Sequence, residues 1–110
     1  MISHTEGLFT WGKGLATHCE GYGSTASGAY SHAEGVKTLA SGVNSHVEGN
    51  LTVANRRYNH VFGKCNLKDP NGANEEQIGK YIEIVGNGEF NLKGEIIKES
   101  DARTLDWEGS

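Results

Sequence analysis

The stretch Ser31-His32-Ala33-Glu34-Gly35 recurs, lightly varied, every fourteen residues through the first half of this chain. The other copies are Ser3-His4-Thr5-Glu6-Gly7, Thr17-His18-Cys19-Glu20-Gly21, Ser45-His46-Val47-Glu48-Gly49 and the degraded Asn59-His60-Val61-Phe62-Gly63. All five histidines of the protein occupy the second position of this motif. A fixed internal period of this length is the signature of a repeat architecture.

A related motif lies midway between successive copies, so the underlying step is seven residues. Its copies are Thr10-Trp11-Gly12-Lys13-Gly14, Ser24-Thr25-Ala26-Ser27-Gly28, Thr38-Leu39-Ala40-Ser41-Gly42 and Thr52-Val53-Ala54-Asn55-Arg56. A coiled coil is excluded, because a glycine in every heptad would cost a helix about 1 kcal/mol each and no apolar pair repeats at the required spacing. The pattern instead predicts a short strand and a turn in each half.

Strand alternation separates the positions of each motif into two faces. First positions are mostly serine or threonine, a hydroxyl ladder that could bond neighbouring backbone at the turns. Third positions are small, which suits the cramped interior between two facing strands. The predicted interior residues are Cys19, Ala26, Ala33, Ala40, Val47, Ala54 and Val61.

Glycine at the fifth position is predicted to form the corners, because it adopts a positive φ at little steric cost. The predicted corner glycines are Gly7, Gly14, Gly21, Gly28, Gly35, Gly42, Gly49 and Gly63. Two strands and two corners per fourteen residues give one coil of a parallel solenoid. Leu8, Phe9 and Trp11 crowd the first coil and are expected to cover that end of the stack.

Composition limits what a single copy can achieve. The chain has 110 residues, a hydrophobic fraction of 35% and 16 glycines, so it is one domain, or one module with an appendage, and has a modest core. Stability must come from backbone hydrogen bonds, from regularity or from partner subunits. Cys19 and Cys65 lie in no metal-ligand spacing, and a buried thiol is favoured over a disulfide for Cys19.

Charge and hydropathy exclude two classes of partner. The net charge of −4, without a basic block, argues against nucleic-acid binding. No segment reaches membrane-spanning length, and no signal peptide precedes the first repeat.

The repeat resembles the left-handed parallel β-roll in the heads of trimeric autotransporter adhesins, whose motif reads approximately Ser-Val-Ala-Ile-Gly. The Ser-His-Ala-Glu-Gly form is more similar still to repeats of tail or tail-fibre proteins of phages and prophages of Gram-positive bacteria. This resemblance covers residues 3 to 63 and implies an all-β, intertwined homotrimer. Residues 1–63 would form the roll, and residues 64–110 a strand-rich neck.

Histidine and glutamate stand where the adhesin motif carries valine and isoleucine, so the resemblance implies a polar ladder that faces another subunit. Its members are His4, Glu6, His18, Glu20, His32, Glu34, His46, Glu48 and His60. A hydrogen-bonding ladder kept through duplication is favoured over a metal or anion site formed by three chains. Crowded histidines predict pH-sensitive assembly, with a sign that depends on the opposing glutamates. No catalytic, cofactor-binding or metal residue is assigned.

The C-terminal half is expected to hold a turn over Asp69-Pro70-Asn71-Gly72, followed by a loop or short helical turn over 73–77. Strands are predicted over 80–85, 89–92 and 102–107, and 94–99 is ambiguous between strand and helix. Three phrases resemble the same phage-type proteins. They are His60-Val61-Phe62-Gly63-Lys64-Cys65-Asn66, Ile84-Val85-Gly86-Asn87-Gly88 and Thr104-Leu105-Asp106-Trp107-Glu108-Gly109.

The resemblance implies a non-enzymatic structural or adhesive module of a phage or prophage tail fibre or spike. Copies of the chain would associate into a rigid trimeric rod that contacts a host glycan or protein. The expected location is a virion, as part of a phage tail, or the extracellular cell surface. A bacterial surface adhesin that binds a host glycan or matrix protein is the main alternative. A glycan-degrading tail spike is a weaker one, because the available carboxylates show no recognisable paired spacing. They are Glu83, Glu95, Glu99, Asp101 and Asp106.

Overall fold

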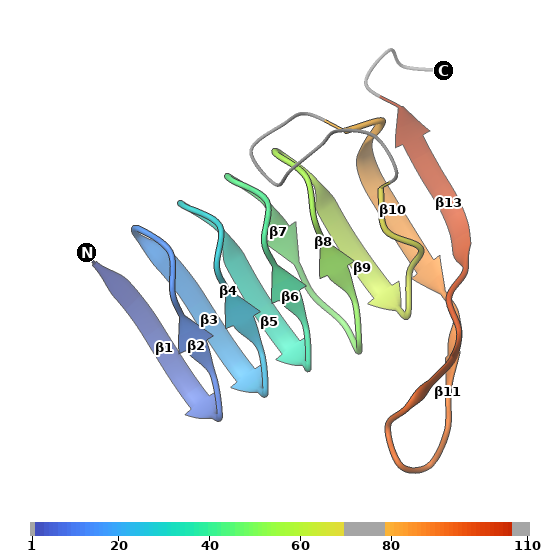
Figure 1. The fold of residues 1–110 in the computed structure, drawn as a ribbon, viewed down its shortest axis with the longest axis horizontal. Coiled ribbons are helices and arrows are strands. Elements are labelled where there is room, and N and C mark those ends of the chain that lie inside the picture. Colours follow the sequence, from blue (N-terminus) through green and yellow to red (C-terminus); the bar gives the residue numbers. More distant parts are fainter. Residues whose placement is uncertain (1, 70–78, 107–110) are drawn as a thin grey trace.

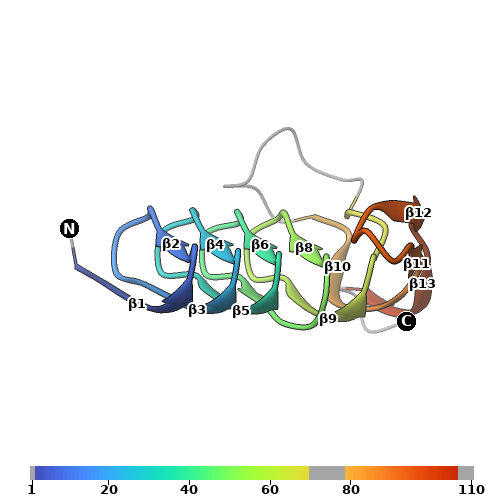
Figure 2. The same ribbon diagram turned by 90° about the horizontal axis from the view of Figure 1, so that it is seen from below.

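The chain folds as an all-β solenoid of about four turns in a computed structural model that describes residues 2–69 and 79–106. Within those residues there is no helix, and hence none long and apolar enough to span a membrane. Successive coils stack side by side from the N-terminal to the C-terminal end (Figure 1). Seen from below, the coils present two facing layers of strands (Figure 2).

One layer is a seven-stranded sheet in the order β1-β3-β5-β7-β9-β10-β13. Its strands are β1 (Ser3–Leu8), β3 (Thr17–Tyr22), β5 (His32–Val36), β7 (His46–Val47), β9 (His60–Lys64), β10 (Tyr81–Asn87) and β13 (Asp101–Asp106). Pairing is parallel from β1 to β10, and β13 joins β10 in antiparallel fashion. The register places like on like, with His18 opposite His32 and Cys19 opposite Ala33.

The other layer is a four-stranded parallel sheet of two-residue strands in the order β2-β4-β6-β8. These strands are β2 (Trp11–Gly12), β4 (Thr25–Ala26), β6 (Leu39–Ala40) and β8 (Val53–Ala54). A hairpin of β11 (Glu89–Phe90) and β12 (Ile96–Lys98) projects beyond the coils (Figure 1). Residues 94–99, ambiguous from sequence, thus contain a strand.

The interior is a single column of small side chains contributed alternately by the two layers. All seven residues predicted to line it are fully buried, and Ile84 of β10 extends the column. Ser24, Ser31, Thr38, Ser45 and Thr52 are buried beside it. Their hydroxyls bond within the fold: Ser31 and Ser45 donate to the Gly28 and Gly42 carbonyls at 2.6 Å. The hydroxyl ladder therefore satisfies polar groups in the turns.

The two corners of each coil differ in the backbone conformation of their glycines. Gly7, Gly21, Gly35, Gly49 and Gly63 have φ between 101° and 111°, and a Cβ at any of the first four would collide with the carbonyl oxygen of the next glycine in that series. The expectation of positive φ is wrong for the glycines of the other corner. In both corners the residue two positions later is left-handed, and in the first corner these residues are Phe9, Gly23, Lys37, Leu51 and Cys65.

The glycines of that second corner are Gly14, Gly28 and Gly42, and the left-handed residues are Ala16, Tyr30, Asn44 and Tyr58, with φ between 54° and 66°. A Cβ at Gly28 would collide with the backbone of Gly42. Glycine is required here by the close approach of successive coils, not by its own dihedral angles.

The two ends of the stack differ. Leu8, Phe9 and Trp11 are 55%, 69% and 58% exposed, so the prediction that they cover the first coil is wrong for a single chain. Thr5, at an interior position, is exposed as well, which leaves the N-terminal end open.

The C-terminal end of the four-stranded sheet is closed by side chains that imitate a strand. Asn66 accepts a hydrogen bond from the Val53 amide at 2.8 Å and donates to the Val53 carbonyl at 3.0 Å. Asn55 does the same with Asp69, at 3.0 and 3.1 Å. The backbone groups of Val53 in β8 are thus paired although no further strand follows in this layer.

Asp69 connects this closure to the start of β10. Its buried carboxylate accepts hydrogen bonds from the amides of Lys80 and Tyr81, both at 2.8 Å, and from the Asn59 side chain at 3.4 Å. Asn59 also donates to the Tyr81 carbonyl at 2.6 Å. The turn predicted over residues 69–72 and the loop predicted over 73–77 lie outside the described residues, except for Asp69. Trp107 also lies outside them.

Although the motif ends at Gly63, β10 continues the seven-stranded sheet. His60 pairs with Glu83, Val61 with Ile84 and Gly63 with Gly86. Parallel stacking therefore continues past the last copy of the motif, and antiparallel β13 forms the edge of the sheet.

Replacing Gly35 with alanine is predicted to destabilise the fold by roughly 3 kcal/mol, because the new Cβ is forced into the left-handed region and against the Gly49 carbonyl. Chemical denaturation of Gly35→Ala measures the loss. Gly94→Ala is the matched control, since its φ is also positive but no backbone lies near its Cβ. It should cost about 1 kcal/mol. Equal losses would contradict the close-approach explanation.

Replacing Asp69 with alanine is predicted to cost about 2–4 kcal/mol, because the amides of Lys80 and Tyr81 lose their acceptor. Thermal unfolding of Asp69→Ala against Glu89→Ala, a change at an exposed carboxylate, tests this. A midpoint for Asp69→Ala no lower than that of Glu89→Ala would show that the closure contributes nothing to stability.

Candidate functional site

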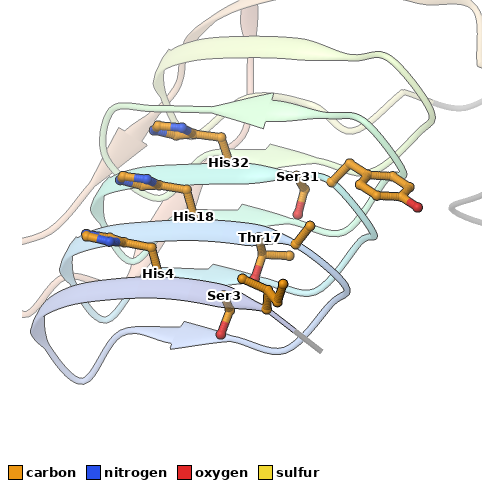
Figure 3. A pocket seen from close by; sticks show the side chains of 9 residues that line it. Ser3, His4, Thr17, His18, Ser31 and His32 are labelled. Carbon is orange, nitrogen blue, oxygen red and sulfur yellow. The ribbon is translucent and has the colours of Figure 1, made fainter.

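The outer face of the seven-stranded sheet carries a continuous column of histidines and glutamates, here called the His/Glu ladder. Each parallel strand from β1 to β9 contributes one histidine, and the register stacks it on the histidine of the next strand. In Figure 3 the imidazoles of His4, His18 and His32 lie one above another, beside a second column formed by Ser3, Thr17 and Ser31. The histidine positions follow directly from the fourteen-residue period.

The imidazoles of the first four coils are stacked face to face. Ring centroids are 4.7 Å apart between His4 and His18, 4.4 Å between His18 and His32, and 4.5 Å between His32 and His46. The last two of these ring pairs are parallel within 3°. His60 breaks the series with a tilt of 64° to His46, and its ring centroid lies 5.4 Å from that of Phe62. The stack is therefore regular only where the motif is intact.

Each histidine lies close to a glutamate carboxylate, but the partner changes along the ladder. In the first three coils the contact is within the strand, with Nε2 to carboxylate distances of 3.5, 3.7 and 3.6 Å. His46 and His60 instead approach the glutamate of the preceding coil, Glu34 and Glu48, at 3.7 and 3.5 Å. One oxygen of Glu34 therefore lies between two imidazoles.

These contacts are too long to be ordinary hydrogen bonds. The Nε2 atoms of His18, His32, His46 and His60 are hidden from solvent and have no hydrogen-bond partner within the described part of the chain. The side chains themselves remain 32–45% exposed. The ladder is thus an accessible surface with polar atoms that a single chain leaves unsatisfied.

Crowding has an electrostatic consequence at His46. Partial burial, and then the neighbouring His32 and His60, lower the pKa of His46 below its ordinary value, while Glu48 opposes the shift. A neutral imidazole is the form that this environment favours near pH 7. Positive charge does not accumulate readily in the middle of the stack.

A shallow, open groove borders the N-terminal end of the ladder (Figure 3). It is lined by side chains of the first coils, including Ile2, Ala16 and Tyr30 together with the histidines. Tyr30 is 55% exposed and Ile2 80%. The groove is open to solvent and belongs to the open N-terminal end of the stack.

The C-terminal carboxylates have structural partners. Glu83 contacts the Arg103 guanidinium at 2.7 Å, Glu99 lies 3.5 Å from the Lys68 ammonium, and Asp101 accepts a hydrogen bond from the Leu67 amide at 2.8 Å. Burial raises the pKa of Asp101, in spite of that hydrogen bond. These contacts join β10, β13 and the segment after β9.

Sequence reasoning missed Glu83 as the residue that follows His60 in the ladder register. The stretch Ile82-Glu83-Ile84-Val85-Gly86 carries the signal, because a buried residue at its third position and glycine at its fifth repeat the motif frame.

Both cysteines are free and fully buried, and burial raises the pKa of each thiol. The Cys19 thiol lies 2.9 Å from the Ser24 carbonyl oxygen, to which it donates.

Comparison with known proteins gave no match to a family model, to a curated protein or to a solved structure. The site is therefore interpreted from its own geometry.

Acidification is predicted to destabilise the protein. The measurement is made with a chelator present, so that metal ions in the buffer do not bind the histidines. The pKa of His46 is lower in the folded protein than its ordinary value of about 6.5. Below pH 6.5 the unfolded chain therefore binds more protons at His46 than the folded chain does. As a result, the free energy of unfolding falls as the pH is lowered from 6.5 towards 5. The groups that face His46 are His32 on β5, His60 on β9, and the carboxylates of Glu34 and Glu48.

Thermal midpoints measured between pH 7.5 and 5 test this prediction. His46→Gln should reduce the slope, since it removes the shifted group while the adjacent strands keep their pairing. A midpoint that stays constant, or that rises as pH falls, would contradict it.

Proposed function

We propose that this chain is a non-enzymatic structural or adhesive module of a phage or prophage tail fibre or spike. In this proposal three copies pack as a homotrimeric, left-handed β-roll, and the segment after Gly63 forms the neck. The module would stiffen or space a fibre, or present a surface to a host glycan or protein.

The size of the core is the observation that supports assembly most strongly. It is a single column of eight fully buried residues, four of them alanine. Burial of methyl groups contributes far less than burial of large side chains, at about 25 cal/mol per Å² of apolar surface. The large apolar residues are instead exposed, among them Phe9 at 69% and Ile97 at 64%. Such a distribution is typical of a chain that buries more surface against partners.

Two faces are suited to contact with other copies. The His/Glu ladder covers one and leaves four ring nitrogens without a hydrogen-bond partner among the described residues. The outer face of the four-stranded sheet presents one residue from each successive coil. Trp11 is exposed, and Thr25, Leu39 and Val53 are half-buried. A trimer that joins one face to the other would cover polar and apolar positions together.

The assignment to a phage or prophage appendage depends on the repeat phrase and the three C-terminal phrases, which resemble those of phage-type proteins. Rigidity supports a mechanical role, because parallel ladders run without interruption from β1 to β10. The carboxylates of Glu83 and Asp101 are held by Arg103 and by the Leu67 amide, an arrangement that favours structure over glycan cleavage.

Mass in solution tests the assembly. Sedimentation or light scattering should give three chains of 11.8 kDa, about 35 kDa in total. Trp11→Asp should shift the protein towards monomer by placing a charge on an apolar contact, whereas Lys93→Asp, an exposed residue of the hairpin, should leave the mass unchanged. A folded 11.8 kDa monomer would overturn the trimer.

Location tests the rest of the proposal. The protein should be found by mass spectrometry in purified phage particles induced from the source strain. Its presence in the cell-surface fraction and its absence from particles would favour the adhesin alternative instead.

A further inference from the structure

Glu34 is the one residue of the ladder for which a single carboxylate oxygen approaches two imidazoles within the described part of the chain. Its Oε1 atom lies 3.6 Å from Nε2 of His32 and 3.7 Å from Nε2 of His46. The two rings are parallel within 3° and 4.5 Å apart, so both nitrogens lie on the same side of the stack. Hydrogen bonds between nitrogen and oxygen are about 2.7–3.2 Å long, and hydrogen bonding therefore does not explain the arrangement.

The ring nitrogens of this cluster also lack any other partner. Nε2 of His32 and Nε2 of His46 are both hidden from solvent and accept or donate no hydrogen bond within the ranges that the structure describes. Leaving such an atom unsatisfied carries an uncompensated desolvation cost. A ligand that pairs with both nitrogens at once would remove this cost.

The spacing matches the ligand set of a small divalent metal ion. Bonds from zinc to nitrogen or oxygen are about 2.0–2.2 Å long, so two ligands of a tetrahedral ion lie roughly 3.3–3.6 Å apart. The two Nε2 to oxygen distances are within a few tenths of an ångström of that separation, and all three ligand atoms lie within 4.8 Å of one another. Because the two rings are stacked in parallel, they must turn about their Cβ–Cγ bonds to point both Nε2 lone pairs at one ion. We propose that His32, Glu34 and His46 form a binding site for a divalent transition metal ion of the zinc class.

The chemistry of the donors selects this class of ion. Two imidazoles and one carboxylate suit Zn²⁺ and its neighbours Co²⁺, Ni²⁺ and Cu²⁺, whereas Mg²⁺ and Ca²⁺ prefer oxygen ligands alone. Three protein ligands leave the fourth position of a tetrahedral ion to water or to a group of another molecule. Side-chain exposure of 32–41% gives the ion a path to the site.

Sharing of histidines limits how many ions the ladder can hold. Four overlapping groups of two histidines and one glutamate have suitable spacing, and neighbouring groups have one histidine in common. If each Nε2 binds one ion, occupation of the His32/Glu34/His46 group leaves the His4/Glu6/His18 group as the only other complete set among the described residues. His4 and Glu6 are 60% and 61% exposed, so this second group should bind more weakly.

The site lies within one chain, so it does not depend on the trimer or on the phage assignment. A metal site could form in a monomer, and a trimer could form without metal. Failure of one proposal therefore leaves the other standing.

Titration of the chelator-stripped full chain with Co²⁺ tests the site, because coordination by two imidazoles and a carboxylate gives visible absorption bands that the hydrated ion lacks. One tight equivalent per chain is expected, and Zn²⁺ should displace it. His32→Gln, His46→Gln and Glu34→Gln should each weaken Zn²⁺ binding at least tenfold. His60→Gln is the matched control and should bind within twofold of the unmodified protein, since His60 is tilted away and lies outside the proposed group.

Circular dichroism and sedimentation of the same variants show whether they keep the fold and the mass. Glu34→Gln is close in shape to the native residue and decides the question even if the histidine variants misfold. A Co²⁺ spectrum identical to that of the hydrated ion would overturn the proposal. Zn²⁺ affinity for folded Glu34→Gln equal to that of the unmodified chain, or an equal loss in His60→Gln, would also do so.

Discussion

The narrow gap between the two layers of strands is the constraint on which the rest of this structure depends. Its interior accepts one column of side chains, from Cys19 to Ile84, and most of them are no larger than valine. At the corners the backbones of successive coils approach so closely that a Cβ at Gly21 would overlap the Gly35 carbonyl. Small residues and glycine are therefore required by packing at fixed intervals, and the fourteen-residue period is the consequence.

A stack of this kind has no natural end, and its two ends are handled differently. At the C-terminal end, Asn66 supplies the hydrogen bonds of a missing strand to Val53. Asn55 of the last coil pairs with the Asp69 backbone, and the Asp69 carboxylate connects this closure to β10. At the N-terminal end β1 leaves an open sheet edge together with exposed Leu8 and Phe9. An unprotected edge with apolar residues beside it favours pairing with further protein, which agrees with a role inside a larger assembly.

The sequence predicted the interior column, the hydroxyl ladder and one of the two corners, because each depends on alternation and on a period that can be counted. It did not predict β10 as a continuation of the stack, since Ile84 follows Val61 by 23 residues where the motif requires 14. Left-handed Tyr30 and Tyr58 were missed because bulky residues rarely adopt positive φ, and the geometry of the folded corner imposes it. The role of Asp69 depends on segments that meet only after folding.

Parallel stacking in register brings identical residues into contact, and its effect depends on the residue. For alanine, contact with itself is favourable packing. For histidine it places titratable rings 4.4–4.7 Å apart over the first four coils and hides the Nε2 atoms of His18, His32 and His46. Glutamate two positions later supplies compensating charge, yet at 3.5–3.7 Å it does not complete hydrogen bonds. The alignment follows from the register alone. The hidden nitrogens without a hydrogen-bond partner among the described residues are the feature of the His/Glu ladder that stacking does not explain.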